Sequence, residues 1–95
     1  MSLGTYRKQP ADERDVDIDC ADWLDELGGD TLASATVTSV APSGLTVDAP
    51  IVSDTSLKVW VRGGDDDVDY VVALLIVTTG GRKREVEFKV KVRDR

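Results

Sequence analysis

Two long runs of strand-forming residues, 69–79 and 83–94, flank the dipeptide Gly80-Gly81. The first run, DYVVALLIVTT, is apolar on both faces. The second run, KREVEFKVKVRD, alternates apolar and charged residues with the period of two that is typical of a strand. Two glycines supply the backbone angles that a tight turn between strands needs. The pattern therefore predicts a long antiparallel hairpin, with Gly80 and Gly81 in a structural role at its turn.

Elsewhere the chain alternates between short strand-like segments and turn-forming residues. Strands are expected over 16–19, 31–40, 45–48, 51–53 and 57–62. No strand is followed by a helical stretch long enough for a parallel crossover. About seven short strands in mainly antiparallel order predict an all-β fold, an immunoglobulin-like antiparallel β-sandwich. Residues 1–14 lack any period and are expected to form an extended N-terminal arm, with the immunoglobulin-like domain over 15–95.

The composition of the chain disfavours several classes of function. The formal net charge of −6 argues against nucleic acid as a partner, because phosphate groups attract basic surfaces. No apolar run reaches the roughly 18 residues that a membrane span requires. The segment MSLGTYRKQP lacks the apolar core of a signal peptide. Cys20 is the single cysteine, so no internal disulfide can form, and we expect a reducing cytoplasm and no cofactor.

The stretch DVDIDCADWLDE (15–26) has two interpretations. A calcium loop would take oxygen ligands at its positions 1, 3, 5 and 12. Its sixth position, which favours glycine, is Cys20, and the polar segment around Pro10 leaves no helix in front of the loop. A strand explains the pattern better, because alternation then places one row of carboxylates outward: Asp15, Asp17 and Asp19.

An outward row of carboxylates repels itself unless a basic row lies beside it. The segment 89–93 offers such a row with the same period: Lys89, Lys91 and Arg93. We predict that the first strand, 15–19, pairs in parallel with the last strand, so that the two rows face each other. Each exposed pair contributes only ~0.2–1 kcal/mol, so the pairing would select the register more than it stabilises the fold. The alternative is that the two rows meet between subunits.

An acidic loop after Arg62 offers weak candidates for a calcium site: Asp65, Asp66, Asp67 and Asp69. Such a loop is more often only solvated. The sequence has no histidine, no activated nucleophile and no pair of carboxylates placed around a pocket. Cys20, without a histidine beside it, reads as a buried apolar residue. We therefore expect a protein that is not an enzyme, with no catalytic residue and no bound metal.

Alternation along 69–79 sends Tyr70 and every second residue after it into the core. Tyr70 directly follows a loop, which we expect its hydroxyl to tie back. The residues in between form an outward apolar row: Val71, Ala73, Leu75 and Val77. Trp60 also points away from the apolar row of its own strand. An outer apolar row must be covered, either by the chain itself through Trp23, Leu24 and Leu27, or by a neighbouring protein.

A series of short marks recurs in one order along the chain. They are Lys8, Pro10, VDID, DWL (22–24), GGDT (28–31), GLTV (44–47), VWVRGG (59–64), Tyr70 and GGR (80–82), followed by an alternating last strand. Together they resemble a family of small phage and prophage proteins of the fibre–tail adaptor type, over about residues 8–94. The resemblance implies an immunoglobulin-like virion part without catalytic residues. Most of the recurrent positions read as fold determinants. The residues that match recurrent positions of the family are Trp23, Trp60, Gly63, Gly64, Tyr70, Gly81 and Arg82.

We therefore predict a non-enzymatic phage or prophage structural protein of the virion, associated with the tail or connector, that docks on other virion proteins. Docking would use Trp60, the outward apolar row and the two charged rows. The expected partners are other virion proteins or a second copy of the chain. Folding in the host cytoplasm would precede entry into the virion. The alternative is a ligand-binding sandwich that uses Trp60 and the acidic loop for carbohydrate or calcium.

Overall fold

The computed structural model describes residues 2–94, which form eight strands and one short helix. The elements are β1 (Ser2–Lys8), β2 (Glu13–Asp19), α1 (Ala21–Glu26), β3 (Leu32–Ala41), β4 (Leu45–Val47), β5 (Ile51–Val52), β6 (Ser56–Gly63), β7 (Val68–Thr78) and β8 (Lys83–Val92). No helix among the described residues combines the length and the apolarity that crossing a membrane would take.

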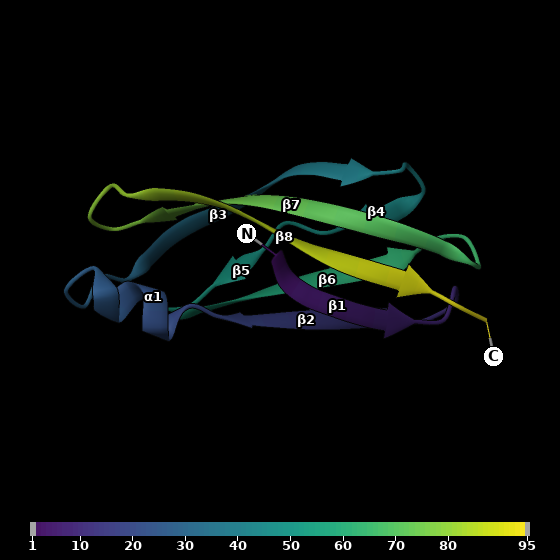
Figure 1. Cartoon of the computed structure of the whole chain (residues 1–95), viewed down its shortest axis with the longest axis horizontal. Coiled ribbons are helices and arrows are strands. Elements are labelled where there is room, and N and C mark those ends of the chain that lie inside the picture. Colours follow the sequence, from purple (N-terminus) through teal and green to yellow (C-terminus); the bar gives the residue numbers. More distant parts are fainter. Residues whose placement is uncertain (1, 95) are drawn as a thin grey trace.

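Two layers of strands lie face to face along the long axis of the molecule (Figure 1). One sheet has the strand order β1-β8-β7-β3. The other has the order β2-β6-β4, with β5 also paired to β6. The hairpin expected at Gly80-Gly81 is β7–β8, paired from Val77 opposite Lys83 to Val68 opposite Val92. The prediction of an all-β sandwich is confirmed, and its immunoglobulin-like character stays a prediction.

The core consists of the inward rows of the two sheets. In β7 the inward side chains of Tyr70, Val72 and Leu74 are fully buried, as are those of Phe88, Val90 and Val92 in β8. Across the interface, β6 contributes Leu57, Val59 and Val61, and β2 contributes Val16 and Ile18. Burying each such aliphatic side chain stabilises the fold by about 1.5–3 kcal/mol. The alternation that predicted these strands is thus the pattern that closes the sandwich.

The pairing predicted for the strand at 15–19 is wrong. The neighbour of the last strand is β1, which runs parallel to β8 with Tyr6 opposite Val90 and Lys8 opposite Val92. The acidic strand β2 lies in the other sheet, antiparallel to β6. A tight turn that includes the bond from the Asp12 N–H to the Gln9 carbonyl (3.1 Å) carries the chain from one sheet to the other.

Segment 2–8 forms a strand along the edge of β8, although its sequence shows no alternation of apolar and polar residues. Most of the segment expected as an arm, 1–14, therefore lies along a sheet, while residue 1 is outside the described residues. Its inward side chains are Tyr6, packed edge-on against Phe88, and Lys8, which is buried. The Lys8 ammonium donates to the carbonyls of Gln9 (2.6 Å) and Pro10 (3.4 Å), and its burial lowers its pKa. Because the inward residue Lys8 is charged, segment 2–8 does not show the alternation of apolar and polar residues by which the other strands were predicted.

The segment around Trp23 closes one end of the sandwich and leaves the outer row of β7 uncovered. Leu24 of α1 is buried in the core between the sheets. Trp23 packs against the core edge, with the Arg84 guanidinium 5.0 Å from the centre of its ring. Cys20, at the start of the helix, is buried, and this burial raises the pKa of its thiol. Leu24 and Trp23 thus pack into or against the core and do not cover the outer row of β7.

The loop between β6 and β7 is tied to the core through Tyr70. The Tyr70 hydroxyl, fully buried, accepts a hydrogen bond from the Asp65 N–H at 2.8 Å. Gly64 has a φ of +89°, and a Cβ there would lie 2.9 Å from a methyl group of Val92. Only glycine lets the loop pass this close to the β8 end of the core.

The turn between β7 and β8 is fastened to the start of β3 by Asp30. One carboxylate oxygen of Asp30 accepts from the N–H groups of Thr31 (2.9 Å) and Gly80 (3.1 Å), and the other contacts Arg82 at 3.1 Å. The Thr78 hydroxyl, followed by these N–H groups and Arg82, holds the pKa of Asp30 below its usual range. Gly81 has a φ of +87°, so the turn also depends on a glycine.

Replacing Tyr70 with phenylalanine should remove one buried hydrogen bond and leave the Asp65 N–H without its partner. We expect a loss of about 1–2 kcal/mol in the free energy of unfolding, measured by urea titration. Tyr6→Phe is the matched control, because the Tyr6 ring packs against Phe88 and its hydroxyl ties down no loop. Equal stability of Tyr70→Phe and the unmodified chain would contradict the role of the hydroxyl.

Replacing Asp30 with asparagine should lower the melting temperature at pH 7. The pKa of Asp30 is lower in the folded state than in the unfolded state. The contribution of ionised Asp30 to the stability of the fold is therefore fully present above the unfolded pKa of about 3.9 and is lost as the pH falls below that value. The difference in melting temperature between Asp30→Asn and the unmodified chain should therefore shrink between about pH 5 and pH 3. A difference that stays constant over this range would rule out an ionised Asp30 as the fastening group.

Candidate docking surfaces

The outer face of the β2-β6-β4 sheet carries the two large apolar side chains that are exposed among the described residues. Trp60 has an exposed fraction of 39% and Ile51 one of 61%. Alternation along β6 turns Trp60 outward while its neighbours Val59 and Val61 face the core. Ile51 stands opposite Lys58, beside the same strand. We call this surface, with the charged residues described next, the Trp60 face.

Carboxylates outnumber cations on the Trp60 face. Its cations are Lys58 and Arg62, and its carboxylates are Glu13, Asp15, Asp17, Asp19 and Asp48. The ammonium of Lys58 lies 3.4 Å from Asp15 and 3.9 Å from Asp17. With both cations already shared by carboxylates, the face keeps an excess of negative charge. It favours a partner that brings positive charge.

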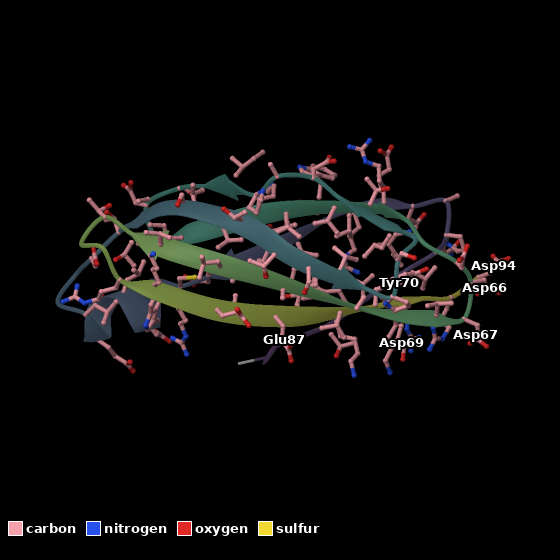
Figure 2. All side chains as sticks on the ribbon, turned by 90° about the horizontal axis from the view of Figure 1, so that it is seen from above. Asp66, Asp67, Asp69, Tyr70, Glu87 and Asp94 are labelled. Carbon is pink, nitrogen blue, oxygen red and sulfur yellow. The ribbon has the colours of Figure 1, made fainter. Side chains whose placement is uncertain are left out.

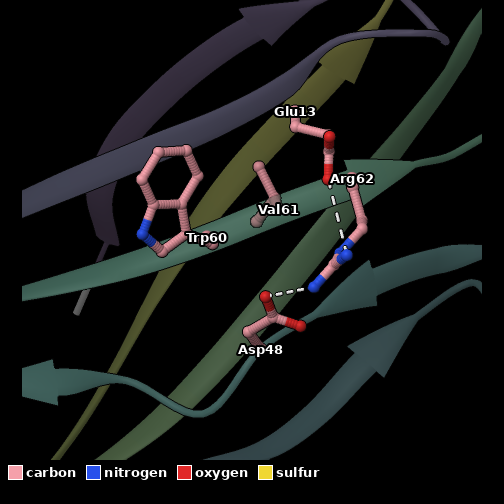
Figure 3. A pocket seen from close by; sticks show the side chains of 5 residues that line it. All are labelled: Glu13, Asp48, Trp60, Val61 and Arg62. Atoms are coloured by element: carbon pink, nitrogen blue, oxygen red, sulfur yellow. Dashed lines mark hydrogen bonds and ion pairs between the residues drawn. The ribbon is translucent and has the colours of Figure 1, made fainter.

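A shallow groove of about 280 Å³ runs beside Trp60 (Figure 3). Its lining residues are Glu13, Asp48, Trp60, Val61 and Arg62. Arg62 extends between two carboxylates, with Glu13 at 3.4 Å on one side and Asp48 bound on the other. Such exposed ion pairs add little stability, but they hold the guanidinium in one place next to the indole. The groove thus presents a fixed pattern of apolar and charged groups.

The outward apolar row of β7 lies on the opposite side of the molecule. Its members are half-buried, and we call them the β7 stripe: Val71, Ala73, Leu75 and Val77. On one side they face charged residues of β8, with Lys89 opposite Val71 and Glu85 opposite Leu75. On the other side, β3 places only small residues against them: Ser34, Thr36, Ser39 and Ala41. Figure 2 views this sheet, with Asp69 and Glu87 labelled along it.

The structure separates the two charged rows that the sequence suggested would meet. The acidic row of β2 faces Lys58, because Asp15 stands opposite Trp60 and Asp17 opposite Lys58. The basic row of β8 lies in the other sheet, where Lys91 stands opposite Asp69. Arg93 binds Asp69 at 2.7 Å and Asp67 at 3.4 Å. The predicted internal pairing of the two rows is therefore wrong: Asp15 and Asp17 pair with Lys58 instead, and Arg93 pairs with the acidic loop.

Three carboxylates of the acidic loop contact the two residues that follow β8, Arg93 and Asp94 (Figure 2). Asp66 accepts from the Asp94 N–H at 2.6 Å, while Asp67 and Asp69 approach Arg93. The hydrogen bond from Arg93 is the main reason that the pKa of Asp69 is lowered. Within residues 2–94, no group of carboxylates or cysteine is arranged to hold a metal ion. The loop therefore acts as a set of anchors for the chain after β8.

Sequence reasoning missed the partners that fix Arg62 and the exposed Ile51. Alternation alone places Lys58, Trp60 and Arg62 on one side of β6. Glu13 and Asp48 join them only through the register of β2 against β6 and the return of the chain after β4. No local signal marks such a cross-strand neighbour. Ile51 could have been noticed as an apolar residue directly after Pro50, in a two-residue strand.

Comparisons with known proteins give one family and one similar fold. The family described as "Podophage GP4 fiber-tail adaptor protein gp77" matches residues 8–91. No curated protein matches the sequence. The solution structure of amebosin is similar in fold, with a TM-score of 0.52 and 16% sequence identity, over 97% of this chain and 96% of that one. At this identity the likeness concerns the fold alone.

Trp60 should contribute little to stability if its side chain serves a docking surface. We expect Trp60→Ala to lower the free energy of unfolding by less than about 1 kcal/mol, since surface substitutions have small effects. Val61→Ala, next to it and fully buried, should cost about 1–3 kcal/mol. Urea titrations of the two variants give the comparison. A larger loss for Trp60→Ala than for Val61→Ala would mean that Trp60 is part of the core.

Proposed function

The chain belongs to the podophage GP4 fiber-tail adaptor protein gp77 family, and we propose that it joins two neighbouring virion proteins through opposite faces of its sandwich. It is thus a structural protein of the phage tail-adaptor type. The observation that carries the proposal is the separation of its two outward-facing apolar surfaces. The Trp60 face belongs to the β2-β6-β4 sheet, and the β7 stripe belongs to the other sheet.

The Trp60 face has the make-up of a binding hot spot. An exposed tryptophan beside a fixed arginine combines the two residue types that most often dominate interface energies. The surrounding carboxylates would exclude acidic partners and attract basic ones. We therefore assign to this face a partner with a basic surface and a pocket or apolar patch for the indole ring.

The β7 stripe suits a different partner. It is an apolar row with charges of both signs along β8, among them Lys83, Glu85, Glu87 and Lys89. Its neighbours on β3 are small and uncharged, so a partner side chain can reach Leu75 and Val77 without a steric barrier. Two surfaces of different chemistry allow one small domain to hold two different proteins in a defined order.

The proposed role is non-enzymatic, without a cofactor. Each carboxylate in the groove beside Trp60 is engaged with Arg62, and the thiol of Cys20 is buried with a raised pKa. A carbohydrate-binding role would call for a second aromatic platform, whereas Trp60 is the aromatic residue in the lining of its groove. The excess of negative charge on the Trp60 face argues against nucleic acid. Assembly would take place in the host cytoplasm, before the chain becomes part of the virion.

The proposal is tested in a phage that lacks its own copy of this gene and receives the chain in trans. Trp60→Ala and Leu75→Thr should each reduce the amount of chain in purified particles at least tenfold, because losing a hot spot costs about 2 kcal/mol or more of binding energy. Quantitative mass spectrometry measures the content. Glu26→Ala, an exposed change on α1, is the control and should assemble normally.

Cross-linking of the same particles identifies the neighbours. Lys58 reports on the Trp60 face and Lys89 on the face of the β7 stripe. The proposal predicts that these two lysines link to different virion proteins. Normal incorporation of both variants, or links from both lysines to a single protein, would overturn it.

A further inference from the structure

The two long sides of the sandwich are closed to different degrees. On the side of β1 and β2, Arg14 bridges the two sheets: its guanidinium donates to the Arg7 carbonyl at 2.6 Å and lies 5.5 Å from the centre of the Tyr6 ring. The Arg14 side chain thus links the two sheets on this side, because it binds a backbone carbonyl of β1 and stacks over the Tyr6 ring.

On the side of β3 the sheets meet without strand pairing: β3 lies beside β5 and β4. β3 is the last strand of its sheet, and no strand among the described residues pairs with its second edge. At the start of β3, the Leu32 N–H donates to the Asp54 carbonyl at 2.9 Å. Behind this edge, four valines pack against the core but stay half-exposed: Val37, Val40, Val47 and Val52. The core is therefore incompletely covered along β3.

The edge of β3 lacks most of the features that usually prevent strand pairing. Proteins protect exposed edges with charged side chains, proline, β-bulges or very short strands. Here β2 carries alternating charges, β1 carries Arg7, and β4 has three residues. β3 has ten residues, and no charged residue occurs from Thr31 to Val47. Two irregularities in its pairing with β7, between Leu32 and Ser34 and between Val37 and Ser39, leave Ser34–Val37 as its regular run.

We propose that a second copy of this chain covers the edge of β3 with its own β3. Residues that stand opposite each other in an antiparallel pair lie on the same face of the sheet. A twofold axis beside Thr36 then brings Thr36 opposite its own copy and Ala35 opposite Val37, so that hydroxyl meets hydroxyl outside and apolar meets apolar inside. No like charges stand opposite each other in this pairing. The uncharged, alternating sequence of β3 is thus complementary to a second copy of itself.

This pairing is independent of the proposed docking function. It would join the two β1-β8-β7-β3 sheets side by side, through an edge that is separate from the Trp60 face and the β7 stripe. Both surfaces would stay available on each copy. The dimer would then offer two copies of each surface, related by the twofold axis.

Self-association is measured by sedimentation velocity over a wide range of concentrations. The unmodified chain should form dimers as its concentration rises. Thr36→Lys and Thr36→Glu, each an exposed change, should weaken dimer formation at least tenfold by placing like charges opposite each other. A 1:1 mixture of the two variants should restore it, because lysine then faces glutamate. Thr5→Lys on β1 is the matched control and should dimerise like the unmodified chain.

Hydrogen exchange on the unmodified chain provides a second reading. Amides within Ser34–Val37 should gain protection as the concentration rises, while those of β1 should not change. A chain that stays monomeric at every concentration would overturn the proposal and leave the edge to a strand of another protein. Dimers that are equally stable in Thr36→Lys, or a mixture that fails to recover, would overturn it as well.

Discussion

The packing of β7 between β8 and β3 is the interaction on which the rest of this molecule depends. Its inward row fills the core, and its backbone pairs on both edges over most of its length. A strand in this central position needs apolar residues on its inner face only. The outer face of β7 is nevertheless apolar, and α1 contributes Leu24 to the core instead of covering that face. The same strand that builds the core thus also forms an outward apolar row, to which the proposed function assigns a partner.

Charge divides the molecule into two faces with different preferences. The acidic strand β2 lies beside Trp60, where Lys58 and Arg62 balance only part of its charge. The basic end of the chain lies in the other sheet, tied to the acidic loop through Arg93. Because the two groups of charges do not neutralise each other, each face keeps its own electrostatic character. Under the proposed function, this separation would allow a small adaptor to distinguish its two neighbours.

Local patterns in the sequence predicted the hairpin and the core, and long-range register decided the rest. Gly80-Gly81 between two strand-like runs was sufficient to place β7 and β8, and alternation identified the buried rows. β1 was not predicted as a strand because its inward residue Lys8 is charged although it is buried. The partners of the acidic row could not be predicted, since charge and period fitted Lys89 and Lys91 as well as Lys58. The strand order decides between these partners, because it places β2 beside β6 and β8 in the other sheet.

The central claim is that both outer faces are covered in the assembled particle. Hydroxyl-radical footprinting compares the oxidation of individual side chains in the free chain and in purified virions. The account predicts that Trp60 and Leu75 both lose reactivity in the virion, while Trp23, packed against the core edge beneath Arg84, changes little. If Trp60 or Leu75 is oxidised in the virion as fast as in the free chain, that face carries no partner and the two-faced adaptor is contradicted.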